Sequence, residues 1–351
     1  MRYTTFGRGT GLRVSEYALG TANFGTLWGG GARREEARSI FERFAEAGGT
    51  FLDTADNYQM GESERLLGEF LGSDRDHFVV ASKFSLGAGR PRVSTTGNSR
   101  KSMRSSVEAS LKRLGTDYID VYWAHLPDGV TPVEEILQAL DDLIHAGKIL
   151  YAGLSNFPAW RVSRAVTMAD LRGLNRLVGI QCEYSLAERG AERELLPMAE
   201  ALGLGTALWA PLGGGLLTGK YRKSRDGRLS DWDGLAIRLE DSEERTAVID
   251  TLLEIAEETG VPAAQVAIAW LRARAARAAT AMVPVIGPRT TDQLEDYLGA
   301  LRLTLDDAQL ARLDKAGAIR PGQPYELIEG SRDAVLGRQS ARFSAPGVPV
   351  A

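Results

Sequence analysis

The sequence is poor in the residues that build disulfide and metal frameworks. Its 351 residues include a single cysteine, Cys182, and three histidines. One cysteine excludes an intramolecular disulfide and a cysteine-based zinc site, so we expect no bound metal and a reducing, cytoplasmic compartment. No window approaches about 18 uninterrupted apolar residues, and the N-terminus has no long apolar stretch, which argues against a membrane span and a signal peptide.

An excess of positive charge is also missing. The 42 Lys and Arg residues are outnumbered by 46 Asp and Glu residues, giving a formal net charge of −4. A general nucleic-acid binder normally carries a basic surface field, so we expect a small-molecule partner instead. Hydrophobic residues make up 44% of the chain and charged residues 25%, which is typical of a globular protein. Oligomeric state stays open.

Proline-rich linkers, low-complexity tracts and internal repeats are absent as well, and we therefore predict one domain over residues 1–351. Short apolar runs rich in strand-forming residues recur between segments with helical spacing. Eight such runs are candidate strands: Tyr17–Leu19, Phe51–Asp53, Phe78–Lys83, Ile119–Trp123, Leu150–Leu154, Leu177–Gln181, Thr206–Trp209 and Met282–Ile286.

Helical spacing lies between these runs, for example at Val107, Leu111 and Leu114. Alternation of strand and helix predicts right-handed βαβ units and a parallel sheet. Eight repeats over this length favour a closed (β/α)₈ TIM barrel. The first 16 residues, "YTTFG" and "LRVSE" around "RGTG", predict a hairpin that covers the bottom of the barrel.

Three segments are too long and too polar to be simple connections: Ser85–Asn98, Arg222–Glu244 and the C-terminal tail from about residue 319 to 351. Long loops on a compact domain are usually functional or disordered. We expect these loops, together with Leu126–Thr131, to border the substrate site at the carboxyl ends of the strands.

Four polar side chains emerge at three successive predicted strand ends. Asp53 and Tyr58 leave the first of them, Lys83 ends the second and His125 follows the third. Singly, each has a structural alternative as a turn former, a packing residue or a solvated group. Chemistry in a barrel of this kind lies at these strand ends, which favours a functional interpretation of the set.

The four groups are chemically complementary. A tyrosine hydroxyl has a pKa near ~10, and a neighbouring lysine ammonium favours the phenolate and lowers that pKa. An aspartate paired with the lysine fixes its position, and an imidazole can orient a carbonyl oxygen by a hydrogen bond. We therefore predict Tyr58 as the acid, Lys83 and Asp53 as its tuning pair and His125 as the orienting group.

Several ordered segments resemble the aldo-keto reductases over most of the chain, namely "FLDTADNY", "SVEASLKRLGTDYIDVYWAHLPD", "YAGLSNF", "QCEYSL", "WAPLGGGLLTGKY" and "PVIGPRTTDQLEDYLGAL". The resemblance implies a (β/α)₈ barrel that binds NADPH in an extended pose and reduces an aldehyde or ketone. It implies the same four roles for Asp53, Tyr58, Lys83 and His125. Whether the substrate is a keto sugar, a natural product or a simple aromatic aldehyde, and which direction is physiological, stay open.

The same resemblance implies the cofactor contacts. They are Thr21 and Ala22 near the ribose, with Asp53 beside them; Ser155, Asn156 and Gln181 around the carboxamide; Trp209 on the nicotinamide face; Pro211, Leu212, Gly213, Gly215 and Lys220 along the pyrophosphate; and Gly287, Arg289, Gln293 and Asp296 at the adenosine end. A guanidinium at Arg289 suits the 2′-phosphate of NADPH, which favours NADPH over NADH. Tyr297 stands where the family usually has Asn.

Two other functions compete with this interpretation. The potassium-channel beta subunits resemble this chain too, which allows an NADPH-binding regulatory subunit with little turnover, but they carry Asn in place of His125. The stretch from Gly214 to Lys220 also reads G-x-x-x-x-G-K, close to an ATP-binding P-loop, yet Tyr221 replaces its Ser or Thr. A P-loop continues directly into a helix, whereas a long charged loop follows Lys220. The complete set of four residues favours the enzyme.

Overall fold

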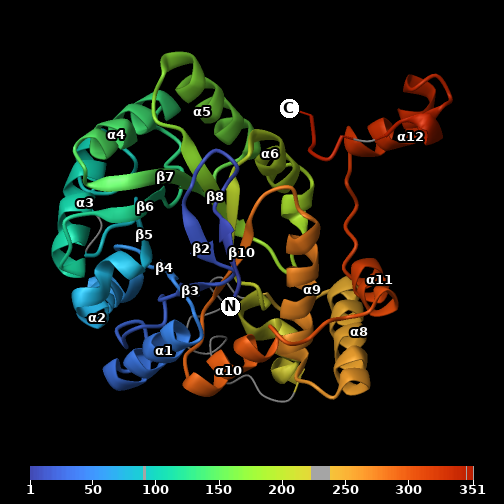
Figure 1. The fold of residues 1–351 in the computed structure, drawn as a ribbon, viewed down its shortest axis with the longest axis horizontal. Coiled ribbons are helices and arrows are strands. Elements are labelled where there is room, and N and C mark those ends of the chain that lie inside the picture. Colours follow the sequence, from blue (N-terminus) through green and yellow to red (C-terminus); the bar gives the residue numbers. More distant parts are fainter. Residues whose placement is uncertain (90–91, 223–237, 345, 351) are drawn as a thin grey trace.

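The computed structural model describes residues 1–89, 92–222, 238–344 and 346–350. Eight parallel strands close into a barrel, and helices surround it on the outside (Figure 1). The predicted (β/α)₈ barrel is therefore confirmed, and so is the N-terminal hairpin, which forms a separate two-stranded antiparallel sheet. Most of the long predicted loop Arg222–Glu244 lies outside the described residues.

The eight barrel strands match the predicted ones. Each predicted strand overlaps an observed strand and begins within one residue of it, and β10 pairs with β3 to close the barrel. The strands are β3 Ala18–Gly20, β4 Phe51–Asp53, β5 Val79–Phe84, β6 Ile119–Ala124, β7 Ile149–Ser155, β8 Leu177–Glu183, β9 Gly205–Trp209 and β10 Met282–Ile286.

The helices begin and end where local sequence chemistry dictates. In α3 the Ser99 side chain accepts a hydrogen bond from the Ser102 backbone N–H, and Gly115 ends the helix in the left-handed conformation. The described helices are α1 Arg34–Glu46, α2 Glu62–Leu71, α3 Arg100–Leu114, α4 Val133–His145, α5 Ala159–Arg172, α6 Leu195–Leu202, α8 Glu243–Thr259, α9 Ala263–Arg277, α10 Thr291–Gly299, α11 Asp307–Ala316 and α12 Tyr325–Val335.

Strand alternation places two charged residues inside the barrel. Phe51 and Ala81 belong to the core within the barrel, whereas their neighbours Leu52 and Val80 pack outward against the helices. Successive side chains of a strand point to opposite faces. Asp53 and Lys83 lie two residues beyond Phe51 and Ala81, so both point inward at the carboxyl ends of β4 and β5.

The hairpin closes the opposite end of the barrel. Its strands β1 Tyr3–Thr5 and β2 Arg13–Ser15 are joined by a turn that carries Phe6. The Phe6 ring is fully buried and contacts Phe51 edge-on, with ring centroids 5.4 Å apart. A Cβ atom added to Gly179 would lie 2.7 Å from this ring. Only glycine leaves room there, and the predicted cover at the barrel bottom is present.

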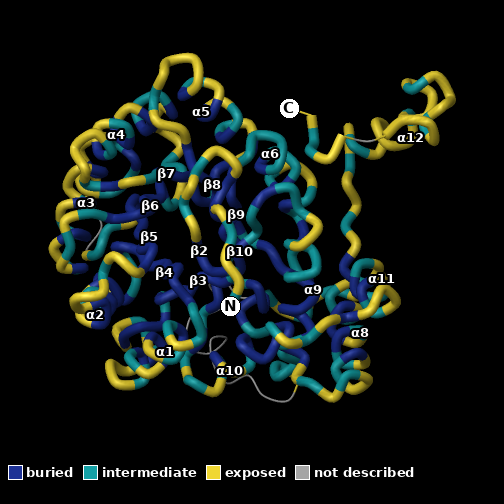
Figure 2. The backbone as a smooth tube through the Cα atoms, viewed as in Figure 1, coloured by how far each residue is buried: buried dark blue, intermediate teal, exposed yellow. Residues whose placement is uncertain are grey.

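The C-terminal segment differs from the expected tail or loop, because it contains helix α12. Apolar residues at Leu327, Ile328 and Val335 recur at helical spacing, which favours a helix. No residue of α12 is buried, and the helix stands away from the barrel (Figures 1 and 2). Among the described residues, no helix is long and apolar enough to cross a membrane.

Candidate active site

A large cavity opens at the carboxyl ends of the barrel strands. Its volume is about 1040 Å³, at the upper end of the range for ligand pockets. Asp53, Tyr58 and His125 line one part of it, and Arg289 and Asp296 line another. The wall also contains most of the other residues predicted to hold a cofactor: Ala22, Asn156, Gln181, Trp209, Pro211, Leu212, Gly215, Lys220, Gly287 and Gln293.

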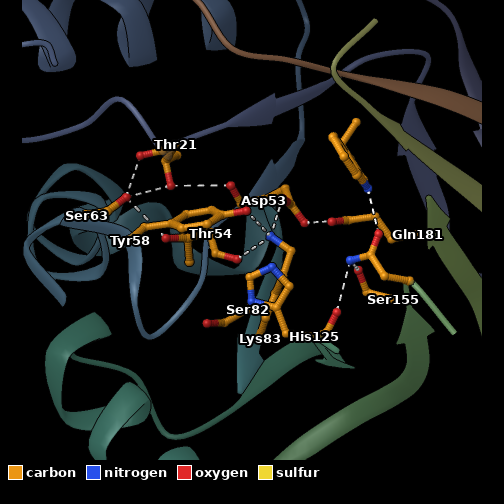
Figure 3. Close-up of polar contacts among 12 residues, drawn as sticks. Thr21, Asp53, Thr54, Tyr58, Ser63, Ser82, Lys83, His125, Ser155 and Gln181 are labelled. Carbon is orange, nitrogen blue, oxygen red and sulfur yellow. Dashed lines mark hydrogen bonds and ion pairs between the residues drawn. The ribbon is translucent and has the colours of Figure 1, made fainter. Parts of the chain in front are cut away.

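Lys83 joins the predicted catalytic residues (Figure 3). Its Nζ atom donates to Asp53 Oδ2 at 2.5 Å, to the Thr54 carbonyl at 2.8 Å and to the Tyr58 hydroxyl at 3.0 Å. The Lys83 side chain is fully buried. A buried ammonium with three acceptors is held in one position, so the Tyr58 hydroxyl has a fixed cationic neighbour, as the sequence predicted.

Burial and charge act in opposite directions on this pair. Burial opposes the charged form of Lys83, but Asp53 and Tyr58 outweigh it and raise the pKa of the ammonium above its ordinary value. Burial raises the pKa of the Tyr58 phenol, and the positive charge of Lys83 lowers it in part. The lysine therefore acts with the predicted sign, and it remains charged at neutral pH.

His125 supplies a neutral imidazole above the same hydroxyl. Burial lowers its pKa to about 3, and the charge of Lys83 contributes in the same direction. The His125 and Tyr58 rings meet edge-on with centroids 6.0 Å apart. A neutral imidazole can donate one N–H to a carbonyl oxygen without adding charge, and it keeps this state throughout the physiological pH range.

A chain of amides continues from Asp53 along the cavity. Gln181 Nε2 donates to Asp53 Oδ1 at 2.8 Å. Asn156 donates to the carbonyl of His125 at 3.0 Å and accepts at 3.0 Å from the indole N–H of Trp209. These contacts fix the two amides and the indole plane before any ligand binds, which reduces the entropy cost of binding.

The glycine-rich segment after β9 forms short turns. Gly214 and Gly215 have φ angles of 69° and 104°, a region that favours glycine. The Tyr221 hydroxyl donates to the Gly214 carbonyl at 2.9 Å and so stabilises the turn. In the part of the chain that the structure describes, Lys220 begins a 3₁₀ turn, Lys220–Arg222, and no α-helix begins there. The segment lacks the loop-to-helix geometry of a P-loop.

At the far end of the cavity, Arg289 is held by its surroundings. Its backbone N–H donates to Gln293 Oε1 and its guanidinium to the Gly30 carbonyl, both at 2.9 Å. Asn23 donates to the Gly287 carbonyl at 2.8 Å. The connection between β3 and α1 therefore runs along the cavity and contacts the β10 to α10 connection.

Three predicted cofactor residues do not line the cavity. The Thr21 backbone N–H donates to the Asp53 carbonyl at 2.9 Å, Ser155 is buried beside Asn156, and Gly213 is buried at the start of the glycine-rich turn. These three residues are buried behind the residues that line the cavity. Their predicted ligand contacts stay predictions.

Sequence reasoning missed other lining residues, chiefly Trp28, whose indole meets the Tyr58 ring edge-on at 5.9 Å. A tryptophan in a glycine-rich segment after a strand end was the available signal. Further lining residues that were not predicted are Gly20, Asn23, Asn57, Leu86, Leu126, Ala210, Gly214, Thr218, Ala264, Val285 and Tyr297. Leu86 and Leu126 come from two of the expected border loops. Among the described residues, none after Tyr297 contributes, so the C-terminal segment does not border the cavity as expected.

The model of the aldo/keto reductase family matches residues 17–318 of this sequence. The chain belongs to the aldo/keto reductase family. Norsolorinic acid reductase stcV of Emericella nidulans is 37% identical over 328 residues, which cover 91% of this chain and 82% of the relative.

Two further relatives have a similar sequence identity to this chain. The uncharacterized oxidoreductase YrpG of Bacillus subtilis is 37% identical over 339 residues, covering 94% of this chain and 99% of the relative. A Saccharomyces cerevisiae protein that carries the name of an aryl-alcohol dehydrogenase, AAD14, is 33% identical over 343 residues, covering 93% and 89%. As a member of the aldo/keto reductase family, this protein is an oxidoreductase that acts on carbonyl groups of small molecules.

Proposed function

We propose that this aldo/keto reductase reduces an aldehyde or ketone with NADPH and that Tyr58 is the general acid. The observation that carries the proposal is the 3.0 Å contact between Lys83 Nζ and the Tyr58 hydroxyl, with Asp53 holding the lysine from its other side. A fixed ammonium next to the hydroxyl favours the phenolate and so partly offsets the effect of burial on the pKa of Tyr58.

The geometry supports one role for each of these groups. When bound, a reduced nicotinamide supplies the hydride. The His125 imidazole orients the carbonyl oxygen towards Tyr58, and the Tyr58 hydroxyl donates its proton to the oxygen as the alkoxide develops. Lys83 stabilises the negative charge left on Tyr58, because the two groups are already hydrogen bonded and need no rearrangement.

The cavity suits an extended dinucleotide. It runs from the amides of Asn156 and Gln181 past Trp209 to Lys220 and Arg289. Amide groups match a carboxamide, an indole face matches a flat ring, and the two cations match phosphates. At Gly215 an added Cβ would lie 3.1 Å from the Tyr221 hydroxyl, so the glycine keeps the backbone accessible there.

Arg289 is proposed to select NADPH over NADH. We expect Arg289→Ala to weaken NADPH binding about 10- to 100-fold, because charge-assisted hydrogen bonds to the 2′-phosphate contribute about 1.5–3 kcal/mol. NADH binding should change by less than about threefold, since NADH lacks that phosphate. Titrations that follow cofactor fluorescence measure both constants. Arg302→Ala, an exposed arginine outside the cavity, is the matched control. Equal weakening for both cofactors would contradict the assignment.

We propose an aromatic carbonyl compound as the substrate. Beside Tyr58 and His125 the cavity wall is built by Trp28, Leu86 and Leu126, which carry no charge. A flat apolar group gains most from such a surface. The name of one relative points the same way, since it is called an aryl-alcohol dehydrogenase.

A panel of carbonyl compounds tests the proposed function. With NADPH we expect aryl aldehydes and aryl ketones to show a higher kcat/KM than keto sugars or short aliphatic aldehydes. Trp28→Ala should lower kcat/KM for the aryl compounds at least about 10-fold, because a single missing methylene in a hydrophobic pocket already costs about 10- to 200-fold. Short aliphatic aldehydes should be affected least. The absorbance of the reduced nicotinamide reports the rate. Trp160→Ala, an exposed tryptophan outside this cavity, is the control.

Two results would contradict the proposal in different ways. A preference for keto sugars, unchanged by Trp28→Ala, would remove the aromatic substrate but keep the reductase. NADPH binding without turnover of any carbonyl would favour the regulatory function instead.

A further inference from the structure

A second acidic cluster lies directly behind the proposed catalytic site. Asp56 stands two residues before Tyr58, and its backbone N–H donates to the carbonyl of Lys83 at 3.0 Å. The residue is 1% exposed. Neither oxygen accepts a well-aligned hydrogen bond from the residues that the structure describes. Buried carboxylates are normally paired, so this residue calls for a physical explanation.

The groups around Asp56 come from the elements packed outside β5 and β6. Glu64 of α2 is fully buried, pairs with Arg113 of α3 at 2.6 Å and accepts from Ser82 at 2.5 Å. The charge of Arg113 is therefore balanced by Glu64. Tyr122 contributes a buried hydroxyl that has no partner among the described residues. The cation that acts on Asp56, Arg113, is thus already paired with another carboxylate.

Burial, which has the largest effect, and the charge of Glu64 together raise the pKa of Asp56 to about 7. The charge of Arg113 and the backbone N–H groups of Gly87 and Asn57 lower the pKa, but they do not offset the effects of burial and Glu64. The carboxyl group therefore changes its charge in the physiological pH range. Its charge also acts on the reacting phenol. An ionised Asp56 raises the pKa of Tyr58, as burial and Asp53 do, whereas Lys83 lowers it.

We propose that Asp56 is a positioning residue that sets the acidity of Tyr58 through its charge, so that carbonyl reduction is fast when Asp56 is protonated and slow when it is ionised. The inference rests on the proposed role of Tyr58 as the acid. As Tyr58 loses its proton, negative charge develops on the phenol and on the substrate oxygen. An anion at Asp56 opposes both, whereas a neutral carboxyl group does not.

The pH dependence of single-turnover reduction tests this role. In the wild type we expect the rate to fall as pH rises through about 7, and the fall should be roughly three- to tenfold, the effect of a pKa change of about half a unit to one unit in Tyr58. Asp56→Asn cannot ionise and should keep the fast rate of the low-pH form. Asp117→Asn, an exposed aspartate, is the matched control and should retain the wild-type profile.

A second variant tests the sign. Glu64→Gln removes a like charge and leaves Arg113 in place, so the inflection should move to lower pH. An unchanged profile in Asp56→Asn, or a shift to higher pH in Glu64→Gln, would overturn the inference. A purely structural role for Asp56 would lower the rate equally at every pH.

Unfolding measurements test the titration without using activity. A carboxyl group whose folded pKa is raised lowers stability as pH increases from its unfolded value near ~4 towards 7. We therefore expect the stability of the wild type relative to Asp56→Asn to decrease over this interval and to be constant above it. A constant difference at all pH values would show that Asp56 does not titrate and would overturn the inference. Absence of carbonyl turnover in the wild type would instead overturn the proposed function, and this inference with it.

Discussion

Replacing Tyr58 by Phe is expected to reduce kcat about 10²- to 10⁴-fold, the usual contribution of a positioned general acid. The substitution removes the one hydroxyl that Lys83 holds at 3.0 Å in the cavity wall. NADPH affinity should change by less than about threefold, since a single neutral hydrogen bond contributes little to binding. Steady-state turnover and cofactor fluorescence, measured on the same preparation, separate the two effects.

Tyr118→Phe is the control for this substitution. Tyr118 also donates a hydrogen bond through its hydroxyl, to Asp76 at 2.6 Å, but it lies at the surface, outside the cavity. Its loss should leave turnover unchanged. Retention of most activity in Tyr58→Phe would assign the proton to another group and remove the central claim of the mechanism.

Replacing Lys83 by Met is expected to damage both folding and catalysis. The substitution leaves the Asp53 carboxylate buried without its cation, although Gln181 still donates to it. Breaking one side of a buried ion pair costs about 3–5 kcal/mol. Denaturant unfolding should show that loss, and turnover should fall at least about 100-fold because the phenol loses its cationic partner.

A double variant separates the structural from the chemical part. In Lys83→Met with Asp53→Asn neither position of the pair keeps a buried, unpaired charge, so much of the lost stability should return. Turnover should stay low, because nothing then lowers the pKa of Tyr58. Recovery of turnover together with stability would mean that the pair serves the fold alone, and that Tyr58 does not depend on Lys83 as an acid.

The sequence predicted the barrel well because its signals are local. Strands such as Phe51–Asp53 and Met282–Ile286 were predicted at the observed bounds, since short runs of strand-forming residues alternate with helical spacing. Polar residues at strand ends then identified Asp53, Lys83 and His125, because carboxyl ends of parallel strands meet at one face of a barrel. The family resemblance supplied the cofactor residues, most of which line the cavity.

The C-terminal segment was expected as a tail or loop, but it contains α12, because its apolar residues recur at helical spacing between polar ones. The position of Trp28 in the cavity wall has no such local signal. Trp28 and Tyr58 lie in two different loops that are distant in sequence, and their contact forms only on folding. A local sequence pattern cannot predict such a contact.

The sequence by itself determined which elements form, in which order, and which side chains arrive at the reacting end of the barrel. The tertiary structure alone decided their electrostatic state. Burial keeps His125 neutral and brings the carboxyl of Asp56 close to its titration point, while Lys83 stays charged because Asp53 and Tyr58 lie within hydrogen-bond distance. Charge at a site depends on desolvation and on neighbours brought together by folding, and neither can be read from the order of residues along the chain.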